Sequence, residues 1–217
     1  MQKILKWTLI TFSIIIALIY AFDIDYILKG IRVTYLTGNT TAFLSDYEYF
    51  DNRVIEPSAV AQPWAIHEDY NNIEVTAKLN SINQERETKA FLVIKNDSII
   101  YEKYFDGYNE NSKSNSFSMA KSIVVTLLGK AIMDGDIKGL DQPVSDFFEE
   151  YKTGFGASLT VGDLASMSSG MKWNENYYSI INITTESYFS DDLRALILNQ
   201  DIIKTPGEKF RYSSGDT

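Results

Sequence analysis

Residues 117–135 read FSMAKSIVVTLLGKAIMDG and decide what kind of domain this chain contains. Apolar side chains recur there at the three- and four-residue spacing of an α-helix, from Ile123 to Ile132. Gly135 follows the last of them and is a typical helix stop, because glycine adopts the left-handed backbone without strain. The pattern therefore predicts a helix buried in a core, with Ser118 at or next to its start.

Upstream of this helix lies the clearest hairpin signal, residues 89–105, KAFLVIKNDSIIYEKYF. Two runs rich in β-branched and aromatic residues flank a cluster of turn formers at 95–98. Downstream, short amphipathic patterns predict helical segments at 143–151, 161–168 and 191–198. A hairpin first and helices afterwards predict an α+β fold.

The N-terminus carries an apolar run at residues 4–22, close to the roughly 20 residues that cross a bilayer as a helix. Lys3 and Lys6 precede most of it, and Asp23 and Asp25 follow it, which favours a cytoplasmic N-terminus and an exported body. The run is interpreted as an anchor, because a cleaved signal peptide needs small residues at two positions and only one is available. Cleavage remains the alternative.

Three regions are expected along the chain. Residues 1–22 form the signal anchor or signal peptide. Residues 23–63 are rich in tyrosine, show no periodicity and are interpreted as a spacer on the domain surface. Residues 64–217 form the folded domain, placed on the outer (periplasmic or extracellular) face of the membrane.

Composition excludes several classes of function. The formal net charge of −9 argues against nucleic acid as a partner, because phosphates need a basic surface. The chain has no cysteine, which removes thiol nucleophiles, thiolate zinc sites and disulfides. Its one histidine, His67, cannot form a His-Glu-x-x-His metal site and is interpreted as a surface or packing residue. No metal or organic cofactor is expected.

Ser118 and Lys121 fit a Ser-x-x-Lys pattern at the start of the predicted helix. Residues three apart share a helix face, so the lysine amine can approach the serine hydroxyl. Burial and the positive end of a helix both favour a neutral amine, and the first backbone N–H groups can receive oxyanion charge. A plain helix-capping serine is the alternative. The second match, Ser169 to Lys172, stands at a helix end, where carbonyls replace N–H donors.

Tyr212 and Ser214 form a second candidate element, Tyr-Ser-Ser, in an expected extended stretch. A phenol beside an ammonium can relay a proton between a nucleophile and its leaving group. Ser214 lies two residues further, on the same face, and can bond the lysine or the substrate. With 14 tyrosines in the chain, a packing role for Tyr212 is the alternative.

The ordered combination is more specific than any one motif. FSMAKS at 117–122, LTVGDLASMSSGM at 159–171 and PGEKFRYSSGDT at 206–217, after the hairpin, resemble the serine β-lactamase and penicillin-binding protein superfamily. The resemblance is closest to the class C-like branch with esterases and 6-aminohexanoate-dimer hydrolases. It implies a β-lactamase/transpeptidase-like fold, an antiparallel sheet with a helical subdomain, and no cofactor.

The resemblance also implies roles for individual residues. Ser118 matches the nucleophile, Lys121 the lysine of the first motif, and Tyr212 the tyrosine of the second. Ser214, a substrate-binding candidate, stands where many members carry asparagine. A serine at this position is typical of branches that cleave other amides and esters in preference to β-lactams. The implied function is an exported, membrane-anchored serine hydrolase that cleaves small amides or esters through an acyl-enzyme. The natural substrate and the oligomeric state stay open.

A third element of the superfamily, a Lys/His-x-Gly strand, has no match after Tyr212. Lys152-Thr153-Gly154 imitates it but precedes Tyr212. The fold is therefore expected to be incomplete, and the chain to be a fragment or truncated product, inactive or unstable alone. The alternative function is a non-catalytic, membrane-tethered binding or sensor domain on the same scaffold.

Overall fold

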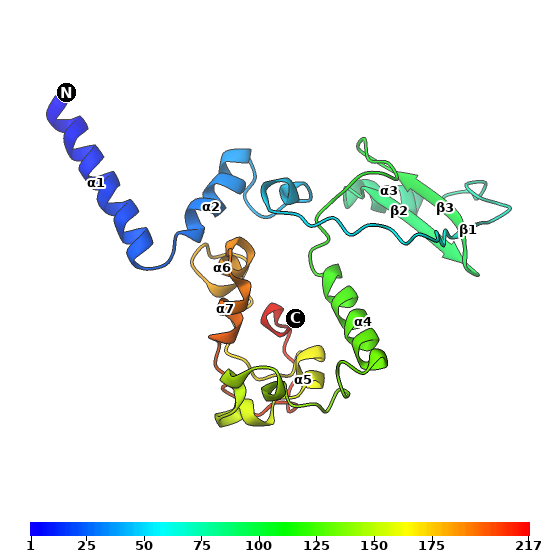
Figure 1. Cartoon of the computed structure of the whole chain (residues 1–217). Helices are drawn as coiled ribbons and strands as arrows, with labels where there is room; N and C mark the ends of the chain where they lie inside the picture. The colour runs from blue at the N-terminus through cyan, green and yellow to red at the C-terminus, as the bar shows by residue number, and fades with distance from the viewer. The chain divides into compact units, whose positions relative to one another are not determined.

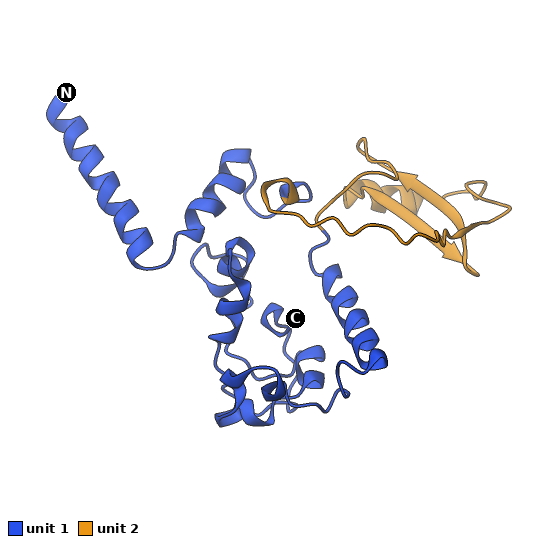
Figure 2. Cartoon of the chain, viewed as in Figure 1, with its two compact units in different colours: residues 1–46, 116–217 blue, residues 47–115 orange.

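The computed structural model describes all residues from Met1 to Thr217 and divides them into two compact units. Residues 1–46 and 116–217 form the larger unit, and residues 47–115 form the smaller one (Figure 2). The smaller unit carries the sheet, while the larger unit is built of helices and turns. This segregation of strands and helices agrees with the expected α+β class.

The smaller unit is a three-stranded sheet with one helix (Figure 1). Its elements are β1 (Ala65–Ile66), α3 (Ala77–Glu85), β2 (Ala90–Lys95) and β3 (Ser98–Tyr104). The central strand β3 pairs antiparallel with β2 and parallel with β1. Asn96 and Asp97 join β2 to β3 with φ of 50° and 58°, the two left-handed residues of a tight hairpin turn. The predicted hairpin is confirmed.

The larger unit contains six α-helices linked by turns (Figure 1). They are α1 (Gln2–Ala21), α2 (Tyr26–Val33), α4 (Met119–Asp134), α5 (Val161–Ala165), α6 (Ile183–Phe189) and α7 (Leu193–Leu198). Helices α5 and α7 lie within two of the predicted helical segments. The third segment, 143–151, instead forms two 3-10 turns, Val144–Asp146 and Glu149–Tyr151. Pro143 precedes them, and the Val144 N–H at their start donates to the Leu159 carbonyl outside the segment.

Around these turns lies a small core of Val144, Tyr151 and Leu159, all at least 95% buried. Packed against it are Phe148, Val161, Leu164, Leu198 and Ile202. Helix α5 begins with a capping box, in which the Thr160 side chain accepts from the Asp163 N–H and the Asp163 carboxylate accepts from the Thr160 N–H. This core supports the loops that carry the candidate site.

The region expected as a spacer contains a packed helix. Helix α2 packs on α6, and Val33 is fully buried. A side chain at Gly30 would lie 3.1 Å from the Phe189 ring, so the glycine allows the close approach. The sequence pattern missed α2 because an eight-residue helix shows only two turns of periodicity.

Helix α4 corrects one prediction. It begins directly after Ser118 and ends at Gly135, whose φ is 84°, both as expected. It is not buried: none of its residues is buried, and the side chains of Ile123 and Leu127 are 60% and 61% exposed. Apolar sequence predicts the helix, but burial depends on which elements pack along it, and no other helix of the larger unit does so.

Helix α1 agrees with the expected apolar run at the N-terminus. Its 20 residues have a mean hydropathy of 2.0 over the best window, and none is buried. It is the one helix of the chain long and apolar enough to cross a membrane. By length and composition it is a candidate membrane anchor or signal sequence.

Candidate active site

Ser118 stands at the N-cap position of α4 with its side chain exposed. Its hydroxyl makes no capping bond to the helix. The preceding residue, Phe117, has a φ of 46°, a left-handed conformation that costs about 1–2 kcal/mol for a residue with a Cβ atom. Backbone strain of this kind marks a tight turn, and here the turn presents the Ser118 hydroxyl at the start of the helix without a bond to the helix backbone.

The first N–H groups of α4 differ from the sequence-based expectation. Those of Met119, Ala120 and Lys121 donate to the carbonyls of residues 116, 117 and 118. They are therefore already paired in a tight first turn. The Ser118 N–H makes no backbone hydrogen bond, so this segment offers one donor to a developing oxyanion instead of several.

Tyr212 reaches Ser118 from the far end of the chain. Its phenolic hydroxyl donates to Ser118 Oγ over 2.7 Å, and the residue is 39% exposed. The segment before Tyr212 is held to the loop after α5, since the Gly207 N–H donates to the Ser168 carbonyl and the Arg211 N–H to the Met167 carbonyl. The predicted pair of serine and tyrosine is thus brought together.

Lys121 lies one helical turn after Ser118 and is half-buried. Its nitrogen donates to Ser214 Oγ over 3.1 Å and lies 5.8 Å from the centre of the Tyr212 ring. It makes no hydrogen bond to Ser118 itself. All four predicted site residues therefore gather in one place, with Tyr212 bonded to Ser118 and Lys121 bonded to Ser214.

Glu175 is the site residue that the sequence did not reveal. One carboxylate oxygen accepts from the Ser214 N–H and from Trp173 Nε1, both over 2.7 Å. The other accepts from the Ser214 hydroxyl over 2.7 Å and from the Tyr177 hydroxyl. No single local pattern marks such a residue, because its partners come from two segments about forty positions apart.

The electrostatics of this carboxylate follow from those bonds. Burial opposes its charge, but the hydrogen bonds from Tyr177, Ser214 and Trp173 outweigh burial and hold the pKa of Glu175 below its ordinary value. Burial and the bond to Glu175 raise the pKa of Tyr177 to about 12. At neutral pH Glu175 is therefore a carboxylate, and Tyr177 keeps its proton and donates it.

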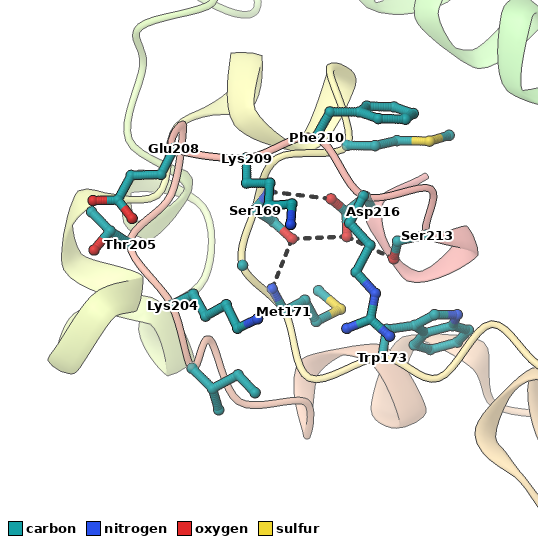
Figure 3. Close-up of a pocket in the computed structure, with 14 residues that line it drawn as sticks. Ser169, Met171, Trp173, Lys204, Thr205, Glu208, Lys209, Phe210, Ser213 and Asp216 are labelled. Carbon is teal, nitrogen blue, oxygen red and sulfur yellow. Dashed lines mark hydrogen bonds between the residues drawn. The ribbon is translucent and has the colours of Figure 1, made fainter.

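A second carboxylate, Asp216, ties the loop at Ser169 to the C-terminal segment at Ser213 (Figure 3). It is 8% exposed and accepts from the Ser169 hydroxyl over 2.8 Å, from the Ser169 N–H over 3.3 Å and from the Ser213 hydroxyl over 2.9 Å. Burial raises the pKa of Asp216. Because Ser169 is buried and bonded here, the second Ser-x-x-Lys match has no accessible nucleophile.

A cavity of about 400 Å³ adjoins this carboxylate. Apolar and cationic side chains line it together, among them Met171, Trp173, Phe210, Lys204, Lys209 and Arg211 (Figure 3). Ser118, Lys121 and Tyr212 do not line it. No group of three or more His, Asp or Glu side chains in the chain is placed to hold a metal ion.

The chain has a β-lactamase-like fold of mixed α+β class. It combines a small sheet, a helix that begins at a Ser-x-x-Lys pattern, and a tyrosine distant in sequence whose hydroxyl donates to that serine. The beta-lactamase family model matches residues 61–216, so the chain belongs to the beta-lactamase family, a family of hydrolases. The resemblance inferred from the motifs is confirmed at this level.

Among solved structures, the chain is similar to a Bacillus anthracis protein named as a 6-aminohexanoate-dimer hydrolase, with a TM-score of 0.54 and 19% identity. The match covers 72% of this chain and 46% of that one, so the chain spans less than half of its structural neighbour. At this identity the likeness shows the fold alone. No curated protein matches the chain.

Proposed function

We propose that this chain carries the acyl-transfer residues of a serine hydrolase that cleaves amide or ester bonds in small molecules. Ser118 is the nucleophile, and Lys121 and Tyr212 are its proton-transfer partners. One observation carries the proposal: the Tyr212 hydroxyl lies 2.7 Å from Ser118 Oγ. That distance is within reach of direct proton transfer between the two oxygens.

The reaction proceeds in two balanced halves. Ser118 Oγ bonds to the substrate carbonyl carbon as its proton passes to the Tyr212 oxygen, whose own proton has first been released to solvent, and the Lys121 ammonium beside the ring offsets the negative charge on that oxygen. Tyr212 then gives that proton to the leaving amine or alcohol as the old bond breaks, leaving an acyl-Ser118 ester. In the second half, water attacks the acyl-Ser118 ester while Tyr212 takes a proton from the water. Tyr212 then returns that proton to Ser118 Oγ as the ester bond breaks, which releases the acid and restores the serine.

The direct test is labelling with a fluorophosphonate, which reacts with activated serines. We expect a single adduct on the peptide that contains Ser118, found by mass spectrometry. The Ser118→Ala variant loses it, whereas Ser122→Ala, an exposed serine on the same helix, keeps it. A folded protein that forms no adduct, or forms one at another serine, contradicts the proposal.

We also propose that residues 4–22 anchor the protein in the membrane with the domain on the outer face. Helix α1 supports this with its length and exposed apolar side chains, and Lys3 and Lys6 lie at its start. The protein is expected in the membrane fraction after a carbonate wash, with an intact N-terminus and a body that external protease digests. A soluble product that lacks the first 21 or so residues would identify a cleaved signal instead.

The second candidate function is a non-catalytic binding domain. It is favoured by the paired N–H groups of Met119, Ala120 and Lys121, which leave one backbone donor at Ser118. Loss of one oxyanion donor typically slows acyl transfer by about 10²–10³-fold. Ligand binding without turnover, unchanged in Ser118→Ala, would favour this candidate over the enzyme.

A further inference from the structure

A chain of hydrogen bonds runs from Lys121 through Ser214 to Glu175. Lys121 Nζ donates to Ser214 Oγ over 3.1 Å, and that hydroxyl donates to Glu175 Oε1 over 2.7 Å. Glu175 forms no direct ion pair with a lysine or arginine. In this chain the Ser214 hydroxyl therefore stands between the Glu175 carboxylate and the Lys121 ammonium.

The direction of this chain is set by Glu175. A serine hydroxyl has one proton and two lone pairs, and an ionised carboxylate can only accept. The Ser214 hydroxyl must therefore donate its proton to Glu175. The lone pairs of the Ser214 oxygen then face Lys121 and accept from it. An amide in place of the carboxylate can donate instead, and it would allow the hydroxyl to turn its proton toward the lysine.

Glu175 is also held rigidly. Both of its oxygens accept two hydrogen bonds, from Ser214 twice, from Trp173 and from Tyr177. Charge-assisted bonds of this kind are about twice as strong as neutral ones. The carboxylate is thus fixed in place, and because it accepts from both the N–H and the hydroxyl of Ser214, the position of Ser214 is fixed as well.

We propose that Glu175 is a positioning residue that acts through Ser214, holding the Lys121 ammonium beside the Tyr212 ring. This rests on the proposed function, because the lysine matters there as the partner of Ser118 and Tyr212. Glu175 touches none of the reacting atoms. It holds the lysine in one orientation, with the ammonium 5.8 Å from the centre of the Tyr212 ring.

The test compares Glu175→Gln with Glu208→Gln. Both variants remove one negative charge without changing side-chain size, but Glu208 is exposed and makes no hydrogen bond to the site. The first measurement is independent of catalysis: trace acetylation of lysines at slightly alkaline pH, with the rate at Lys121 divided by that at Lys130 on the same helix. We expect this ratio to rise about tenfold in Glu175→Gln, since the lysine loses the hydrogen-bonded anchor behind Ser214, and to stay unchanged in Glu208→Gln.

The second measurement is the rate at which a fluorophosphonate acylates Ser118. We expect about a tenfold loss in Glu175→Gln at neutral pH, with thermal melting recorded for each variant. General unfolding would raise the reactivity of Lys121 and Lys130 together, so their ratio separates positioning from a structural role. An unchanged ratio in folded Glu175→Gln overturns the inference. A raised ratio in a protein whose Ser118 never reacts supports the positioning role and overturns the proposed function alone.

Discussion

Replacement of Lys121 by methionine is expected to slow the acylation of Ser118 by about 10²–10⁴-fold, the range found for a lost proton-transfer group. Methionine keeps most of the length and apolar volume of the lysine stem but cannot carry charge. Lys121→Met removes the ammonium that lies 5.8 Å from the centre of the Tyr212 ring, and with it the cation beside the group that exchanges a proton with Ser118. The measurement is the second-order rate of fluorophosphonate labelling.

The matched control is Lys130→Met on the same helix. Lys130 is exposed and pairs with Asp134, away from Ser118, so its loss should leave the labelling rate within about twofold. Tyr212→Phe should cost as much as Lys121→Met, and the double variant little more than either one. The rate losses from mutating residues that act as a unit do not add. Additive losses, or full activity in Lys121→Met, would contradict the shared role.

Replacement of Gly170 by alanine is expected to destabilise the larger unit by about 3 kcal/mol or more. Gly170 has a φ of 73°, and a Cβ atom there would lie 2.4 Å from the Lys204 carbonyl oxygen. That oxygen belongs to the backbone and cannot swing aside. The backbone around Gly170 must therefore shift. That shift disturbs the hydrogen bond from the Ile203 N–H to the Gly170 carbonyl and the neighbouring bond between Ser169 and Asp216.

The control for this variant is Gly154→Ala. Gly154 also has a left-handed backbone, with φ of 59°, but a Cβ atom there meets nothing within 4 Å. It therefore isolates the conformational cost, about 1–2 kcal/mol. Urea unfolding followed by circular dichroism measures both variants. Equal losses of unfolding free energy in the two variants would show that the close approach to the Lys204 carbonyl oxygen is relieved without destabilising the protein.

Much of the secondary structure could be predicted from the sequence because its causes are local. The hairpin follows from alternating β-formers around Asn96 and Asp97, two residues that tolerate positive φ. The end of α4 follows from Gly135. Helix α6 was missed, although Asn182 caps it by accepting from the N–H groups of Thr184 and Thr185. An asparagine cap before a seven-residue helix is a weak signal, since the same residue is common in turns.

The candidate site was predictable only in part. Ser118, Lys121, Tyr212 and Ser214 were found through ordered motifs, and the structure places them together. Glu175 was not found, because an acidic residue in a loop has no distinguishing pattern until Ser214 and Trp173 converge on it. The same holds for Asp216, whose partner Ser169 lies 47 positions away.

The sequence by itself determined the hairpin, the apolar N-terminal helix, and the serine and lysine one turn apart on α4, since each depends on backbone preferences and side-chain spacing over a few residues. Only the tertiary structure decided that α4 is exposed, that its first N–H groups are already paired, and that Glu175 stands behind Ser214. The physical reason is that burial, hydrogen-bond pairing and the direction of a proton chain depend on groups brought together by folding, which no local pattern specifies.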